Sequence, residues 1–244
     1  MRNAPSFVAE RTYQLARKRQ FGVAAAFALA VCLLLGGLMT SSATAADIRL
    51  AALGDSLTAG YGLPADDAFP AKLQAALKAK GHNVVIDNYG VSGDTTIGGL
   101  ARLEGVMRTT PDGVILELGA NDMLRGQDPE AAKANLNTIL ARLAKAGIPV
   151  LLCGMRSAKN YGADYAAAFD AVYPALAQKY DAVLYPFFLD GVTGHYGLTL
   201  ADGLHPTAKG VDVIVERILP DVETFLKRVS VAKAAKAARA DANP

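Results

Sequence analysis

Residue types that build metal and redox sites are scarce in this sequence. Its 244 residues include no tryptophan, three histidines and two cysteines. Cys32 lies in an apolar N-terminal run, which leaves Cys153 as the single cysteine of the remaining chain. One cysteine excludes an internal disulfide there, and no His-x-x-x-His pair or cysteine cluster suggests a metal. Because Cys153 lies in an apolar run, we expect it in the core rather than at a reactive site.

Basic charge is also scarce over most of the chain. The sequence has 25 Lys and Arg against 23 Asp and Glu, but five basic residues lie in 1–45 and five more in 227–244. The body between them, 46–226, has 15 basic and 21 acidic residues, which argues against nucleic acid as a partner. With 52% hydrophobic residues, the composition is that of one globular domain.

The N-terminal residues are typical of an export signal. Four basic residues between Arg11 and Arg19 precede an uncharged apolar run, Phe21–Met39, and the small residues Ala43-Thr44-Ala45 follow. This order predicts a signal peptide over 1–45, cleavage after Ala45 and a periplasmic location without a stable membrane anchor. The alternative is an uncleaved anchor, because the apolar run is nearly long enough to span a bilayer.

Short apolar runs alternate with longer amphipathic stretches over residues 46–228. The runs predict strands that are buried on both faces, and the stretches predict helices. The strands are Ile48–Leu53, Val84–Ile86, Val114–Leu118, Val150–Cys153 and Val183–Phe187, and the helices are 67–80, 96–108, 129–146, 164–180 and 206–228. This alternation predicts an α/β fold, a three-layer α/β/α sandwich around a five-stranded parallel sheet. The basic, alanine-rich tail, 229–244, is expected to be a helical extension or a frayed end.

Ser56 is a candidate nucleophile because it comes directly after the first predicted strand, in Gly54-Asp55-Ser56-Leu57-Thr58. Ligands of such sheets bind at the carboxyl ends of the strands, where the Ser56 hydroxyl is expected. A helix N-cap serine or a phosphate-binding turn explains so short a motif equally well. No Gly-x-x-x-x-Gly-Lys-Ser/Thr loop is present, and Thr58 breaks the Gly-x-Ser-x-Gly pattern.

His205 is the best placed of the three histidines to act as a base. A carboxylate three residues earlier, Asp202, can bind its Nδ1, fix the tautomer and leave Nε2 free to take a serine proton. Pro206 is expected at the first position of the last helix, where it would hold His205 rigidly. His82 falls on a turn at the opposite rim and His195 in a loop. The alternatives for this block are a surface Asp–His pair or a metal site.

Two further polar turns, Gly90–Asp94 and Gly119–Asp122, follow the second and third predicted strands. A backbone N–H in a glycine turn, as at Gly93, and a side-chain amide, as at Asn121, can both donate to an oxyanion. Ser-Gly and Asn-Asp pairs are also common in ordinary turns, so neither block identifies an active site by itself.

Together, and in this order, the four blocks resemble those of the SGNH (GDSL) hydrolases. Over residues 48–220 the resemblance is greatest to the periplasmic branch that contains thioesterase I / protease I / lysophospholipase and related arylesterases. Longer strings strengthen it: GDSLTAGY at Gly54–Tyr61, LELGANDMLRG at Leu116–Gly126, Asn160-Tyr161-Gly162 and Pro186-Phe187-Phe188. The resemblance implies a flavodoxin-like SGNH fold and a serine esterase that needs no cofactor and no metal.

By motif, the resemblance implies that Ser56 is the nucleophile and that Asp202 and His205 complete a triad. It implies an oxyanion hole made by the N–H groups of Ser56 and Gly93 and the amide of Asn121. The substrates would be small-molecule carboxylic esters or thioesters, such as aryl esters, acyl-CoA and lysophospholipids. Apolar residues of the same rim are expected to form an acyl groove: Met155, Tyr161, Phe187, Phe188 and Leu189.

Other functions remain open at this stage. One is a sugar-acetyl esterase of the same fold, and another is a degenerate, structural member of it. A third is a non-catalytic phosphate- or nucleotide-binding α/β module, which would not need Asp202 beside His205. We expect a monomer or weak oligomer that binds no nucleic acid.

Overall fold

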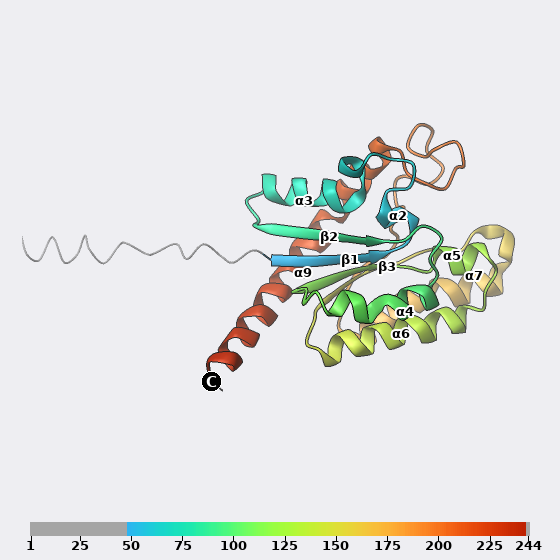
Figure 1. Cartoon of the computed structure of the whole chain (residues 1–244). Helices are drawn as coiled ribbons and strands as arrows, with labels where there is room; N and C mark the ends of the chain where they lie inside the picture. Colours follow the sequence, from blue (N-terminus) through green and yellow to red (C-terminus); the bar gives the residue numbers. More distant parts are fainter. Residues whose placement is uncertain (1–47, 243–244) are drawn as a thin grey trace, which may run out of the picture. The chain divides into compact units, whose positions relative to one another are not determined.

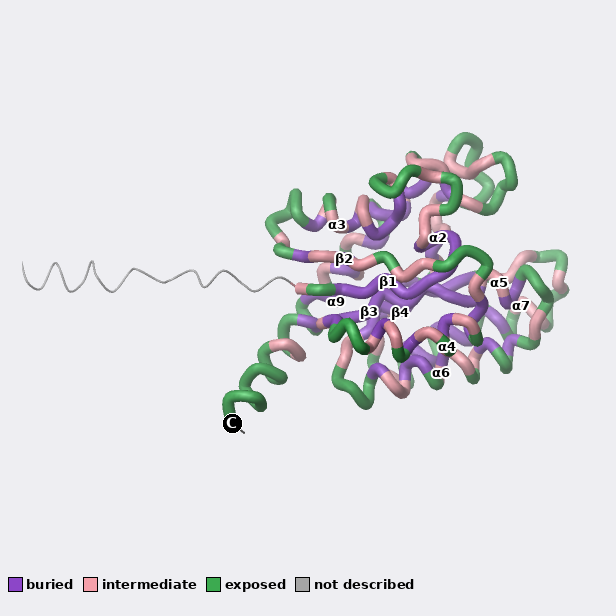
Figure 2. The backbone as a smooth tube through the Cα atoms, viewed as in Figure 1, coloured by how far each residue is buried: buried purple, intermediate pink, exposed green. Residues whose placement is uncertain are grey.

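Five parallel strands form the centre of the structure, a computed structural model that describes residues 48–242. They are β1 (Ile48–Gly54), β2 (Val84–Gly90), β3 (Gly113–Glu117), β4 (Val150–Cys153) and β5 (Val183–Tyr185), in the order β2-β1-β3-β4-β5 (Figure 1). The prediction of a five-stranded parallel sheet is confirmed. Strands β1, β3 and β4 are almost wholly buried (Figure 2), as their nearly continuous apolar sequences require.

Helices cover both faces of this sheet. One layer contains α3 (Phe69–Ala79) and α9 (Ala208–Asp241), which pack against each other, and the other contains α4 (Thr96–Met107), α6 (Pro129–Lys145) and α8 (Val172–Tyr180) (Figure 1). Asp128 caps α6 by accepting a hydrogen bond from the N–H of Glu130, and Pro129 follows as its first residue. The predicted three-layer α/β/α sandwich is therefore confirmed.

Two of the predicted helices differ in their limits. The stretch 164–180 forms two helices, α7 (Ala163–Asp170) and α8, because Pro174 has no N–H to continue the hydrogen bonding of α7. Pro206 is not the first residue of the last helix. That helix, α9, begins at Ala208, and Thr207 caps it by accepting a hydrogen bond from the N–H of Gly210 (3.2 Å).

Short elements that the sequence patterns did not predict lie between the main ones. Helix α2 (Ser56–Ala59) follows β1 and α5 (Ala120–Leu124) follows β3, at the carboxyl ends of these strands. Two 3₁₀ turns, η1 (Ala65–Asp67) and η2 (Lys159–Tyr161), lie in the loops. The sheet order reverses beside β1, and a crevice at this switch point is where ligands bind in such folds.

The two ends of the chain differ in what the structure describes. The predicted signal peptide, 1–45, lies outside the described residues. At the other end, α9 continues through residue 228 to Asp241, with Val229 still buried and every residue from Ala234 to Ala242 exposed. Between residues 48 and 242, no helix has both the length and the hydrophobicity to cross a bilayer.

Candidate active site

Ser56, His205 and Asp202 come together at the carboxyl rim of the sheet. Ser56 begins α2 directly after β1, and His205 lies in the loop before α9. The Nε2 atom of His205 lies 2.9 Å from the Ser56 hydroxyl oxygen, and its Nδ1 lies 2.7 Å from a carboxylate oxygen of Asp202. The imidazole thus bridges a hydroxyl and a carboxylate, the arrangement that lets a histidine take a proton from a serine.

Backbone hydrogen bonds hold the Asp202 carboxylate in its charged form. Its Oδ1 accepts the N–H groups of Leu204 (2.9 Å) and His205 (3.0 Å), while Oδ2 faces the imidazole. These bonds, with that of the His205 backbone the strongest, lower the pKa of Asp202 to about 2. The Tyr61 ring covers the imidazole, with ring centroids 4.4 Å apart. A carboxylate held in its charged form can stabilise an imidazolium without accepting its proton.

The two residues predicted beside Ser56 as oxyanion donors, Asn121 and Gly93, follow β3 and β2. Asn121 lies in the first turn of α5, and its side chain lines the same cavity as Ser56 and His205. Gly93 lies in the turn after β2 at a φ of +80°, a backbone conformation that side chains other than glycine rarely adopt. In the described part of the chain, neither the N–H of Ser56 nor that of Gly93 donates to a protein acceptor. Ser56 and Asn121 line the cavity, whereas Gly93 is not among its lining residues.

Two carboxyl groups are buried beneath the serine. Asp55 and Glu117 are both fully inaccessible to solvent. Oε2 of Glu117 accepts the Thr58 hydroxyl (2.7 Å) and the N–H of Asp55 (3.3 Å), whereas its buried Oε1 has no hydrogen bond to another atom of the described chain. Burial raises the pKa of Glu117 well above its usual range and that of Asp55 to about 6.

Glycine at position 54 makes room for this carboxyl pair. Gly54 pairs with Glu117 between β1 and β3, and a Cβ at position 54 would lie 2.0 Å from Thr58 Oγ1 and 2.7 Å from Glu117 Oε2. Any larger residue would therefore displace one of these groups. The sequence patterns did not identify Glu117 as part of the site, although a carboxylate inside an apolar strand is itself an unusual feature.

An apolar cavity of about 420 Å³ opens beside Ser56. Three of the residues predicted for an acyl groove line it: Met155, Phe187 and Leu189. Two do not. Phe188 is fully buried against Phe69, with ring centroids 4.9 Å apart, and Tyr161 stacks on Tyr165 and donates its hydroxyl to the Leu124 carbonyl. We therefore leave Phe188 and Tyr161 out of the groove.

The cavity also has lining residues that were not predicted from the sequence, and four of them define its edge and its charge. Leu124 of α5 and Leu204 beside His205 are 43% and 46% exposed, so the cavity has an apolar edge. Arg156 and Lys159, both exposed, add positive charge, and the Arg156 guanidinium lies 5.2 Å from the centroid of the Phe187 ring. Loop residues follow no hydrophobic period, so periodicity could not identify these four as cavity residues. The only available sign was that the two leucines are apolar residues in otherwise polar loops.

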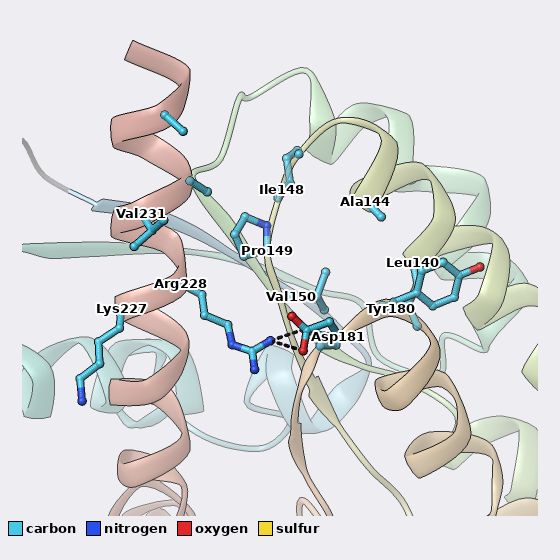
Figure 3. Close-up of a pocket in the computed structure, with 14 residues that line it drawn as sticks. Leu140, Ala144, Ile148, Pro149, Val150, Tyr180, Asp181, Lys227, Arg228 and Val231 are labelled. Carbon is cyan, nitrogen blue, oxygen red and sulfur yellow. Dashed lines mark hydrogen bonds and ion pairs between the residues drawn. The ribbon is translucent and has the colours of Figure 1, made fainter. Parts of the chain in front are cut away.

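A larger cavity of about 620 Å³ lies at the opposite rim, where β4 begins (Figure 3). Its walls are mainly apolar residues of α6, α9 and the β4 entrance, and Arg228 pairs there with Asp181 (3.1 Å). It contains no serine, cysteine or histidine. Within residues 48–242, no group of three or more His, Cys, Asp or Glu side chains forms a candidate metal site. Burial raises the pKa of the Cys153 thiol, which makes it unreactive.

Comparison with known proteins relates this chain to hydrolases. The model of the GDSL-like lipase/acylhydrolase family matches residues 52–213. The chain is 42% identical over 194 residues to thioesterase 1/protease 1/lysophospholipase L1 of Escherichia coli strain K12, a match that covers 79% of this chain and 91% of the relative. It is 39% identical over 187 residues to an arylesterase of Vibrio mimicus, covering 76% and 94% of the two chains.

A solved structure agrees with these matches. The crystal structure of TesA superposes on 72% of this chain and 99% of its own chain, with a TM-score of 0.70 and 38% sequence identity. The fold, the order of the four sequence blocks and the matched length therefore all point to one family.

Proposed function

Because the chain belongs to the GDSL-like lipase/acylhydrolase family and is a carboxylic ester hydrolase, we propose that Ser56 is its nucleophile and that His205 and Asp202 activate it. One observation carries this proposal. The His205 imidazole lies 2.9 Å from the Ser56 hydroxyl on one side and 2.7 Å from the Asp202 carboxylate on the other. A phosphate-binding module would not need this relay.

The reaction is acyl transfer to water in two stages. His205 takes the Ser56 proton as the oxygen attacks the ester carbonyl, and the N–H groups of Ser56 and Gly93 and the Asn121 amide stabilise the oxyanion. The imidazolium, held by Asp202, gives its proton to the leaving group, and an acyl-enzyme remains. Water then attacks the acyl-enzyme, again through His205, and releases the acid. This chemistry uses only the chain's own side chains and backbone.

The substrates are esters or thioesters with an apolar acyl group and, in many cases, an anionic leaving group. The apolar cavity beside Ser56 accommodates an acyl chain, which supports substrates larger than acetyl esters. Arg156 and Lys159 on its lining favour phosphate-bearing leaving groups, as in acyl-CoA and lysophospholipids, while aryl esters use the apolar lining alone. A sugar-acetyl esterase is the second candidate, and the acyl-length series in the Discussion separates the two.

Export is also part of the proposal. The basic residues, the apolar run and Ala43-Thr44-Ala45 support a signal peptide, so we place the mature enzyme in the periplasm. Its partners there are small-molecule esters.

The direct kinetic test is Ser56→Ala with Ser92→Ala as its matched control. Ser92 is an exposed serine of the same rim and forms no hydrogen bond with the described chain. Ser56→Ala should abolish hydrolysis of p-nitrophenyl esters, and Ser92→Ala should keep wild-type rates. Equal loss of activity in both variants, or full activity in Ser56→Ala, would contradict the assignment of Ser56 as the nucleophile.

A further inference from the structure

The buried carboxyl pair beneath Ser56 has no part in the proton transfers proposed above. Asp55 and Glu117 are fully buried, and burial of carboxyl groups is costly unless they are paired or protonated. Asp55 caps α2 through Oδ1, which accepts the N–H of Leu57 (3.0 Å), and its Oδ2 accepts the Asn121 side-chain N–H (3.1 Å). One carboxylate thus connects the nucleophile helix to a proposed oxyanion donor.

We infer that Asp55 is a positioning residue for the proposed oxyanion hole, in which its carboxylate accepts a hydrogen bond from the Asn121 amide nitrogen and keeps that nitrogen turned toward the reacting carbonyl oxygen. This inference rests on the proposed function, because it assumes that Asn121 donates to the oxyanion.

The amide of Asn121 has two faces with opposite effects on an oxyanion. With Nδ2 bonded to Asp55, the second hydrogen on Nδ2 can point into the cavity that Asn121 shares with Ser56. If the amide rotated by half a turn, its oxygen would replace the nitrogen and repel the developing negative charge. An ionised carboxylate only accepts hydrogen bonds, so it selects the first orientation.

Glu117 explains how Asp55 stays ionised in the core. Oε2 of Glu117 already accepts two hydrogen bonds, from Thr58 and from the N–H of Asp55, and its Oε1 is buried without another partner in the described chain. Burial raises the pKa of Glu117 well above its usual range, and the nearby Asp55 charge raises it further. The stronger rise at Glu117 favours a neutral Glu117 beside a charged Asp55.

The first experiment is a double-mutant cycle of Asp55→Asn and Asn121→Ala on a p-nitrophenyl ester. Asparagine is as good an N-cap as aspartate, so α2 keeps its cap, but the amide nitrogen in place of Oδ2 faces Nδ2 of Asn121 and turns that amide around. Each single variant should lower kcat by about 10²-fold with KM unchanged, as expected for one oxyanion donor. Because Asp55 acts through Asn121, the double variant should be no slower than Asn121→Ala.

The outcomes distinguish a failure of the role inferred for Asp55 from a failure of the role proposed for Asn121. If the losses multiply in the double variant, Asp55 acts on Ser56 or His205 instead, and the inference fails while the proposed function stands. If Asn121→Ala alone leaves kcat unchanged, the oxyanion role of Asn121 fails and the inference fails with it. Thermal melts of all three variants check that each is folded.

Glu117→Gln is the conservative variant that tests whether Glu117 acts in its neutral form. Glutamine keeps an acceptor for the Thr58 hydroxyl and the Asp55 N–H and cannot ionise, so it mimics a neutral Glu117, and kcat should stay within about threefold of wild type. A loss as large as that of Asp55→Asn would show that Glu117 is needed as a carboxylate, which overturns the proposed proton position.

A pH profile provides a second test that does not require Asp55→Asn to fold. The pKa of Asp55 is raised to about 6, so below that pH it becomes protonated and no longer fixes the amide. The kcat of wild type should therefore fall more steeply below pH 6 than that of Asn121→Ala, which has no amide for Asp55 to orient. Profiles of the same shape in both proteins would contradict the inference.

Discussion

Ser56 and His205 act as one unit in this account, because the imidazole has a role only while it can take the serine proton. Ser56→Ala and His205→Ala should each reduce kcat on the order of 10⁴-fold or more, and the double variant should be little slower than either. Asp202→Ala should cost less, because Asp202 orients the imidazole and does not carry the proton. Steady-state kinetics on one p-nitrophenyl ester measure all four variants. If the losses of Ser56→Ala and His205→Ala multiplied in the double variant, the two residues would not act as one unit.

At the scale of single residues, the sequence predicts the groups near the substrate better than those beneath them. Ser56, Asn121 and His205 follow strands or precede a helix, so their meeting at one rim follows from the parallel sheet. The contacts of Asp55 and Glu117 depend instead on the register that pairs Gly54 with Glu117, which no local pattern specifies. Packing also removed Phe188 from the predicted groove, since alternate residues after β5 face the core and the cavity.

At the scale of elements, the strands were the most predictable parts. They are short apolar runs whose limits agree with the structure to within a few residues, except that β2 extends to Gly90 and β5 ends at Tyr185. Helices were less predictable at their ends. Pro174 divides one of them, and Thr207 rather than Pro206 sets the start of α9. The short helices α2 and α5 have too few residues to show a period.

The leucines at the cavity edge predict a preference for acyl chains longer than acetyl. Each methylene buried in a groove contributes about 0.8 kcal/mol, nearly fourfold in kcat/KM, so acetyl to hexanoyl should gain about two orders of magnitude at full burial. A graded series of p-nitrophenyl esters measures this. Leu124→Ala should flatten the trend, whereas Val231→Ala, an exposed residue of α9 71% accessible to solvent, should not. A steady fall from acetyl onward would favour the sugar-acetyl esterase.

The basic loop after β4 predicts a specific effect on anionic leaving groups. The double variant Arg156→Gln/Lys159→Gln should raise KM for an acyl-CoA several-fold, because exposed charge pairs contribute about 0.2–1 kcal/mol each. KM for a neutral p-nitrophenyl ester should not change, and the difference should shrink in high salt. Lys236→Gln on the exposed end of α9 is the control. Equal KM changes for both substrates would indicate lost packing on Phe187 rather than lost charge.

At the scale of the whole molecule, the proposed signal peptide is what would place the enzyme in the periplasm. We predict that the mature chain begins at Ala46 or Asp47, because cleavage after Ala45 fits the small residues at positions 43 and 45. N-terminal sequencing of protein from the periplasmic fraction measures this. Ala45→Leu should block cleavage and keep the chain at the membrane. Intact Met1 in the membrane fraction of the wild-type strain would identify the apolar run as a permanent anchor.

The central claim is that one serine of this chain, Ser56, is activated for acyl transfer. A fluorophosphonate probe tests it most directly, because the probe reacts only with a serine whose proton a neighbouring base can take. After labelling the folded protein, peptide mass spectrometry should find one modified residue, Ser56, and the labelling rate should collapse in His205→Ala. Ser92→Ala should label as wild type does. A folded wild-type protein that stays unlabelled, or that carries the label on another residue, would contradict the account.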